Sequence, residues 1–291
     1  MSPLLRTTTI RGIPKRVLDR LVMQPFVQRM LLPFGRDVRD KRWVFILGCY
    51  NSGTTLLAEM LQSHPAFGGL PNEGAFLTDV LPYPERFGWP RMWIECADKL
   101  RIPPDDHRRA IRIRRHWSLW LRGDSPYVVE KSVSNALRID FLARQFEQAH
   151  FVYIVRNGYA VAQGIRRKAN LRRWKNPLGL QEYPIEMCAR QWAETDRVVR
   201  SSPHFPDRIH VVRYEELTED PTTVMNELWR SLGADELGTS EMWRDLQVHE
   251  VRSDVKNMNA RSLQGLTAED VRTITSVCAD ELERYGYTAD V

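Results

Sequence analysis

The stretch that decides the fold is GCYNSGTTLL, Gly48 to Leu57, which directly follows the apolar run WVFIL, Trp43 to Leu47. Two glycines separated by four residues, with hydroxyl side chains after the second, have the spacing of a phosphate-binding loop. Thr54, however, stands where such a loop carries its lysine. The sequence therefore raises the question of which anion the loop binds and which residue supplies the positive charge.

The residues on both sides of the loop predict a turn between a strand and a helix. The run from Trp43 to Gly48 is rich in β-branched and aromatic residues, as buried strands are. The segment from Thr54 to about Ser63 predicts a helix with one apolar face, formed by Leu56, Leu57, Met60 and Leu61. Backbone N–H groups at the start of such a helix suit a phosphate. An ordinary tight turn explains the isolated string equally well.

Three more apolar runs predict strands: YVVE from Tyr127, HFVYIV from His150 and IHVVR from Ile209. Longer segments with helical periodicity separate them, and this alternation is typical of an α/β protein with a central parallel sheet flanked by helices. Lys131 and Arg156 each follow one of these runs. Because α/β proteins bind ligands where parallel strands end, we expect both residues beside the glycine loop.

The composition predicts a globular protein with an anionic ligand. Of the 291 residues, 43% are hydrophobic and 27% are charged, and the net charge is +5. The basic residues do not form one tail, and no zinc, helix-turn-helix or RNA-binding signature accompanies them, so we expect a nucleotide and no nucleic acid as partner. Four cysteines lie far apart, which predicts reduced thiols in a cytoplasmic protein and no metal site: Cys49, Cys96, Cys188 and Cys278.

We expect a single domain over residues 1–291, with two additions to the sheet and its helices. The first is an N-terminal amphipathic extension over residues 1–40, whose apolar residues recur at roughly helical spacing: Leu18, Leu21, Val22, Phe26, Met30 and Leu31. Charged residues interrupt it, so it predicts neither a secretory signal nor a transmembrane segment. We expect it to pack on the protein itself. Contact with a membrane surface, or with a second copy in a homodimer, is the alternative.

The second addition is a helical insertion over residues 83–123. Its tryptophans are Trp89, Trp93, Trp117 and Trp120, and its arginines include Arg108, Arg109, Arg112, Arg114 and Arg115. Such tryptophans stack on the sugar or aromatic ring of an acceptor, or equally well form a helical layer with a solvated basic face. Further along, the turn NPLG after Trp174 and Lys175 is interpreted as a lid over the nucleotide.

Six short segments together show a family resemblance. They are NSGTTLL from Asn51, the pair His64 and Pro65, EKSVSN from Glu130, VRNGYAVA from Val155, VRYEELTEDP from Val212 and VKNMN from Val255. In order and spacing, from about Trp43 to Tyr287, the chain resembles the sulfotransferases that use 3′-phosphoadenosine 5′-phosphosulfate. It is more similar to their bacterial, carbohydrate and protein-tyrosine branch than to the cytosolic steroid and phenol enzymes.

The resemblance implies a three-layer P-loop-like fold and transfer of a sulfuryl group to a hydroxyl acceptor (a sugar, glycolipid, tyrosine or small molecule such as a phenol), with no metal. It implies that Gly48 to Leu57 holds the 5′-phosphosulfate and Arg156 the 3′-phosphate. The donor-binding residues are then Asn51, Ser52, Gly53, Thr54, Thr55, Arg156, Gly164, Lys256 and Asn259.

The chain departs from the family pattern at two of these positions. Asn51 stands where the family usually has lysine or arginine, and Gly164 where it usually has serine. Lys131 is the expected source of positive charge near the sulfuryl group. Near the 3′-phosphate the expected sources are Lys256 or the cluster Arg166, Arg167 and Lys168.

The resemblance also implies a general base, because the related branch uses a glutamate shortly after the first helix. In this chain that residue is Glu73, in LPNEG. Lys131 would neutralise the bridging oxygen as the S–O bond breaks. His64, next to a proline, is expected to be structural, and Asp79 is a weaker rival base. The family uses VRYEEL as a packing element, which includes Tyr214, Glu215 and Glu216.

Two other functions remain open at this point. A P-loop kinase would need a lysine at Thr54 and a carboxylate for magnesium, for which the sequence offers Glu130. A non-catalytic nucleotide-binding or nucleic-acid-binding protein would keep the basic charge and tolerate both departures from the family pattern.

Overall fold

The structure is a computed structural model that describes residues 24–121, 123–244, 246–248 and 251–289. Its main sheet has five strands: β1 (Arg42–Gly48), β2 (Phe67–Gly69), β3 (Tyr127–Glu130), β4 (Ala149–Val155) and β5 (Ile209–Arg213). All pairs are parallel, in the order β2-β3-β1-β4-β5. The predicted parallel sheet is confirmed. Strand β2 was not predicted, because Phe-Gly-Gly is too short to show any alternation.

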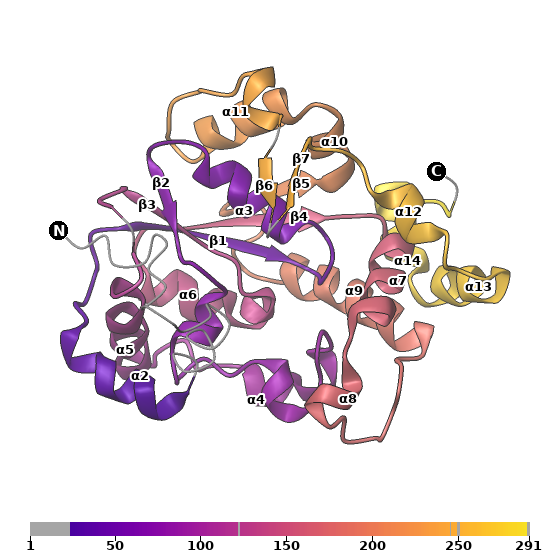
Figure 1. Cartoon of the computed structure of the whole chain (residues 1–291), viewed down its shortest axis with the longest axis horizontal. Coiled ribbons are helices and arrows are strands. Elements are labelled where there is room, and N and C mark those ends of the chain that lie inside the picture. Colours follow the sequence, from indigo (N-terminus) through magenta and orange to yellow (C-terminus); the bar gives the residue numbers. More distant parts are fainter. Residues whose placement is uncertain (1–23, 122, 245, 249–250, 290–291) are drawn as a thin grey trace.

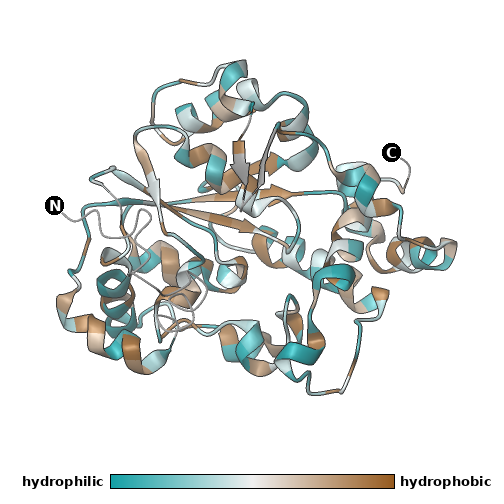
Figure 2. Cartoon of the chain, viewed as in Figure 1, coloured by the Kyte–Doolittle hydropathy of each residue, from teal (hydrophilic) through white to brown (hydrophobic). Residues whose placement is uncertain are grey.

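Helices cover both faces of this sheet, so the three-layer α/β fold is also confirmed (Figure 1). One face carries α3 (Thr54–Gln62), α10 (Tyr214–Glu219) and α11 (Pro221–Ser231); the other carries α5 (His107–Ser118), α6 (Ile139–Gln145), α7 (Gly158–Lys168) and α9 (Ile185–Arg200). Alternate residues of β1 serve the two faces: Val44 and Ile46 pack in one buried cluster, Phe45 and Leu47 in the other. The central strands are accordingly the brown centre of Figure 2.

Residues 83–123 contain η3 (Pro84–Phe87), η4 (Ile94–Cys96), α4 (Ala97–Leu100) and α5. Trp89, Trp93 and Trp117 are buried in the core, and the Trp117 ring lies 5.0 Å from that of Trp43. These three rings therefore pack inside the protein, which is the second of the two interpretations of the tryptophans.

The arginines of α5 fasten the insertion to the segment before β1. Arg114 Nε donates to Asp37 Oδ1 and its Nη1 to the carbonyl of Gln145, while Arg115 Nε donates to the carbonyl of Gly35. These arginines on the basic face of α5 therefore already have hydrogen-bond partners within the protein.

The N-terminal segment is described from residue 24, and Leu18, Leu21 and Val22 lie outside the described residues. It forms α2 (Pro25–Leu31) and η1 (Leu32–Phe34). The helix packs through a polar residue, Gln28, whose amide donates to the carbonyl of Phe76. The helix therefore contacts the rest of the protein through Gln28, whereas the apolar side chains of Phe26 and Met30 are 71% and 59% exposed. Among the described residues no helix is long and apolar enough to cross a membrane.

The remaining elements connect these strands and helices or pack against them. They are η2 (Gly74–Leu77), η5 (Val133–Arg138), α8 (Leu171–Trp174), η6 (Ser240–Trp243), the antiparallel pair β6 (Leu246–Val248) and β7 (Val251–Ser253), α12 (Asn259–Leu263), α13 (Ala268–Val277) and α14 (Ala279–Tyr285). Helix α12 packs on α7, near the end where β1 and β4 point (Figure 1). This C-terminal segment therefore reaches the edge at which the glycine loop lies.

Candidate active site

The glycine loop turns from β1 into α3 through two residues with left-handed backbone. Asn51 has φ 65° and Gly53 has φ 98°; asparagine is among the few residues with a side chain that adopt this conformation readily. Gly53 also has no room for a side chain, because a Cβ there would lie 2.7 Å from the Tyr214 ring. The loop is thus held tightly against the turn after β5.

Two polar atoms of the loop are buried without a hydrogen-bond partner in the described part of the chain: Asn51 Nδ2 and Ser52 Oγ. Buried polar groups in proteins are nearly always paired. Both atoms can donate a hydrogen bond, and they sit in a turn before the positive end of a helix. This donor set fits an anionic group.

Arg156 is buried at the same sheet edge, directly after β4, with 7% of its surface exposed. Its Nε donates to Asn259 Oδ1 (2.7 Å), its Nη1 to the carbonyl of Asn51 (2.8 Å) and its Nη2 to Ser262 Oγ (3.2 Å). All three acceptors are neutral, and burial lowers the pKa of Arg156. A buried charge without a carboxylate partner is costly, so the site favours an anion.

The turn after β5 supports this arginine. The Arg156 guanidinium lies 4.2 Å above the Tyr214 ring. Glu215 accepts hydrogen bonds from the backbone of Asn157 and from Asn259 Nδ2, so the Asn259 amide is held between Arg156 and Glu215. These contacts agree with the packing role predicted for this segment, and they place Asn259 as a support for Arg156.

The other cations predicted to bind the donor differ in whether a carboxylate of the protein already pairs with them. Arg166 forms a bidentate ion pair with Asp270, at 2.7 and 2.9 Å, which removes it as a source of charge for a ligand. Arg167 and Lys168 make no ion pair with any described residue. Lys256 is exposed, and its carbonyl accepts from the Tyr214 hydroxyl.

The two predicted catalytic residues lie together. Lys131 follows β3, the neighbour of β1, and its Nζ is 3.5 Å from Glu73 Oε1. Both side chains are partly exposed. The sheet therefore brings a cation and a carboxylate to the same edge as the glycine loop.

The turn that carries Glu73 is held in place by hydrogen bonds of Gly74 with Glu130 and Trp117. Glu130 Oε1 accepts from the backbone N–H of Gly74 (2.7 Å), and Trp117 Nε1 donates to the carbonyl of Gly74 (3.0 Å). A Cβ at Gly74 would lie 2.6 Å from the Trp117 ring, so only glycine permits this approach. The position of Glu73 is thus set by its neighbour Gly74 and by the contacts of Gly74 with Glu130 and Trp117.

Glu130 is consumed by these structural contacts. Besides Gly74, it accepts from the backbone and hydroxyl of Ser132 and from the amide of Asn135, and it is fully buried. Oε1 thus accepts three hydrogen bonds and Oε2 one, and the residue is 1% exposed, which leaves it little access to a magnesium ion. The contacts therefore count against the kinase interpretation.

Two further residues weighed from the sequence have structural contacts. His64 Nδ1 accepts from the backbone of Ala66, so Nε2 carries the proton and donates to the carbonyl of Asp235. Asp79 is bound in bidentate fashion by Arg112, at 2.8 and 2.6 Å. Burial raises the pKa of Asp79, but the Arg112 hydrogen bonds and charge outweigh it and lower the pKa overall. Asp79 is therefore a poor base.

Two charged residues of the insertion, Glu85 and Arg91, were not predicted from the sequence. Burial raises the pKa of Glu85 to about 7, and the negative charge of Glu73 adds to the shift. Arg91 Nη1 donates to Asn51 Oδ1 at 3.3 Å. Both belong to the insertion and match no motif. The one available signal was their position within a segment already suspected of lining the site.

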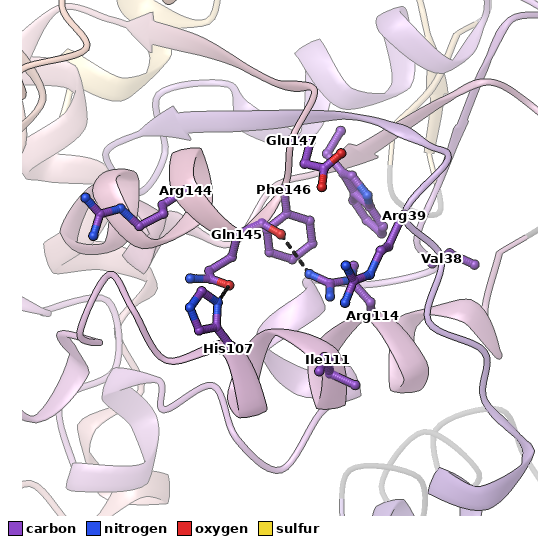
Figure 3. Close-up of a pocket in the computed structure, with 10 residues that line it drawn as sticks. Val38, Arg39, His107, Ile111, Arg114, Arg144, Gln145, Phe146 and Glu147 are labelled. Carbon is purple, nitrogen blue, oxygen red and sulfur yellow. Dashed lines mark hydrogen bonds between the residues drawn. The ribbon is translucent and has the colours of Figure 1, made fainter.

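A cavity of about 250 Å³ lies at the opposite, amino-terminal edge of the sheet, beside Trp43 and Phe146. Figure 3 shows arginines around it, but these have partners: Arg114 bonds to the carbonyl of Gln145 and Arg144 to Asp105. His107 is likewise bonded to the side chain of Gln145. The cavity is thus remote from the glycine loop and lined by groups already engaged.

Comparison with known proteins gives a consistent result. A model described as the sulfotransferase family matches residues 44–237. No curated protein matches the chain. Among solved structures, the sulfotransferase domain from the curacin biosynthetic pathway is 19% identical with a TM-score of 0.53, covering 86% of this chain and 99% of that one. Sulfotransferase STF1 from Mycobacterium tuberculosis is 18% identical with a TM-score of 0.57, covering 90% and 85%. These two structures share the fold.

Proposed function

The chain belongs to the sulfotransferase family, and from this premise we propose that it transfers the sulfuryl group of 3′-phosphoadenosine 5′-phosphosulfate to a hydroxyl acceptor. The observation that carries the proposal is the buried Arg156 guanidinium, bonded to neutral groups of the glycine loop and of α12. An ATP-dependent kinase has no need of a second anion site there. A donor with a separate 3′-phosphate does.

The unpaired donors of the loop support the other half of the donor site. Asn51 Nδ2 and Ser52 Oγ have no partner among the described residues, and Thr54 and Thr55 begin α3. In the proposal these groups bind the 5′-phosphosulfate. The donor supplies the sulfuryl group, and the residues of the chain orient it and accept or donate protons.

Lys131 and Glu73 have complementary tasks in this reaction. Glu73 takes the proton from the acceptor hydroxyl, whose oxygen forms a bond to sulfur while the bond from sulfur to the phosphate oxygen breaks. The electron pair of the broken bond stays on the phosphate. Lys131, 3.5 Å from Glu73, donates a hydrogen bond to this developing charge.

The proposal is tested first by binding. Calorimetry should detect adenosine 3′,5′-bisphosphate, the donor's product, and show much weaker binding of ATP with magnesium. The reverse preference would refute the donor assignment. A screen for transfer of labelled sulfate to sugars, glycolipids, tyrosine peptides and phenols then identifies the acceptor, and failure of every acceptor despite tight bisphosphate binding would favour a non-catalytic protein.

A further inference from the structure

The loop itself carries no cation, yet an arginine from the insertion reaches it. Arg91 Nη1 lies 3.3 Å from Asn51 Oδ1, although 40 residues separate the two in sequence. A guanidinium has five N–H donors. This is the one side-chain hydrogen bond that Arg91 makes with a described residue, so several donors remain for a ligand.

The backbone around Arg91 is fixed in an unusual conformation. Its φ is 59°, in the left-handed region that costs most residues about 1–2 kcal/mol. Neighbours hold the segment in place: the carbonyl of Pro90 accepts from the Tyr183 hydroxyl and that of Gly88 from Asn176 Nδ2. Backbone strain of this kind persists where the surroundings enforce it, and it is common at ligand sites.

Arg91 also belongs to a group of like charges. Burial lowers the pKa of Lys168, and the positive charges of four arginines lower it further: Arg91, Arg167, Arg156 and Arg261. Within the described residues, none of these five side chains forms an ion pair with a carboxylate. Cations that repel Lys168 in this way are stabilised when a ligand with several negative charges binds among them.

On the other side, Arg91 adjoins the acidic residues of the reaction site. Its charge acts on Glu85 and on Tyr50, and both of these also feel the charge of Glu73. Arg91, which bonds to Asn51 in the glycine loop, is thus within electrostatic reach of both Glu85 and Lys168.

We propose that Arg91 is a donor-binding residue that supplies the positive charge missing from the glycine loop, by hydrogen bonding to the 5′-phosphate oxygens of the donor. This inference rests on the proposed function. In this proposal Arg91 binds the 5′-phosphate of the donor and Arg156 binds its 3′-phosphate. It also gives the insertion a role in donor binding.

The test compares Arg91→Asn with wild type by calorimetry, using adenosine 3′,5′-bisphosphate, adenosine 5′-monophosphate and adenosine 3′-monophosphate. Asparagine tolerates the left-handed backbone. Affinity for the first two ligands should fall roughly ten- to hundredfold, as for loss of one charge-assisted hydrogen bond, and affinity for the 3′-monophosphate should stay unchanged. Arg91→Lys should recover most of the loss, and Arg101→Asn, which removes an exposed charge of the insertion, should change none of the three.

The outcomes separate the two proposals. If wild type does not bind the bisphosphate, the donor assignment fails and the role of Arg91 fails with it. If wild type binds and Arg91→Asn binds the 5′-monophosphate equally well, or loses the 3′-monophosphate instead, the role of Arg91 alone is refuted. Should Arg91→Asn not fold, Arg91→Gly replaces it, because glycine adopts the same backbone without a side chain.

Discussion

The side chain of Asn51 occupies the space that a side chain at Gly164 would need. A Cβ added at Gly164 would lie 3.0 Å from both Cβ and Cγ of Asn51, closer than ordinary van der Waals contact. The two positions at which the sequence is expected to depart from the family pattern are therefore in direct contact. Asn51 also contacts Arg91.

This relationship predicts a non-additive pair of substitutions. Gly164→Ser alone should destabilise the protein by roughly 1–3 kcal/mol, because the space is filled. In the Asn51→Gly background, whose backbone suits glycine at φ 65°, the same change should cost much less. Urea unfolding of the four proteins gives the coupling energy, expected to be roughly 0.5–3 kcal/mol. Additive effects would show that the two sites do not compete for space.

Arg156→Ala should weaken binding of adenosine 3′,5′-bisphosphate by roughly 1.5–3 kcal/mol, the value of a charge-assisted hydrogen bond. Affinity for adenosine 5′-monophosphate should stay close to wild type, the opposite pattern to that of Arg91→Asn. Since Arg156 also holds the carbonyl of Asn51, the monophosphate measurement doubles as a check on the loop. Equal weakening of both ligands would mean that Arg156 only supports the loop.

Glu73→Gln should lower turnover by about 10²–10⁴-fold, the range for loss of a general base, and leave donor binding nearly unchanged. The acceptor should be an aliphatic alcohol, because a phenol is acidic enough to need the base less. Near-normal turnover with such an acceptor in the folded variant would falsify the assignment. Glu85, whose pKa is raised to about 7, would then be the next candidate. Asp79 would not, because Arg112 holds it.

Lys131→Ala should remove most turnover while changing bisphosphate affinity only modestly, because the bridging oxygen gains its charge mainly in the transition state. Steady-state rates and calorimetry on the same preparation separate the two effects. Lys131→Arg, which keeps the charge, should retain more activity than alanine. Full activity of the alanine variant would assign the task to another cation, with Arg91 first.

The raised pKa of Glu85 predicts that the free energy of unfolding depends on pH. Burial raises its pKa from 4.5 to about 7, so the folded state holds this proton more tightly than the unfolded state. Its contribution to stability is therefore full below pH 4.5 and is lost as the pH rises to 7. Glu85→Gln should be more stable than wild type at pH 8, by at most about 3 kcal/mol, and the difference should shrink towards pH 5. Urea unfolding at both pH values measures this, with the exposed Glu95→Gln as control.

Much of the fold was predictable because its sequence patterns are local. Four of the five strands are continuous apolar runs, and the glycine spacing of the loop predicts the turn between β1 and α3. Strand β2 carries two glycines and pairs only with β3, so its position depends on its neighbour and leaves little mark on the sequence. The exposure of Phe26 and Met30 on α2 was unpredictable for a similar reason: the side-chain amide of Gln28 turns inward because it donates to the carbonyl of Phe76, far away in sequence.

The candidate site shows the same division. Lys131 and Arg156 were placed correctly at the sheet edge because each follows a recognisable strand. Arg91 was missed because its approach to Asn51 depends on a left-handed backbone and on contacts with Tyr183 and Asn176, none of which has a sequence pattern. Arg166 was overestimated because Asp270, which binds it, lies 104 residues away.

The contact between Gly74 and Trp117 limits which segments of this protein can be exchanged with those of other sulfotransferases. Helix α5 carries Trp117, and the turn that presents Glu73 rests on its ring. A graft that replaces residues 83–123 with the corresponding segment of another sulfotransferase would remove that support and shift the carboxylate. Chimeras intended to change the acceptor should therefore keep α5 and exchange only the residues before it, or transplant the turn and the helix as a single module.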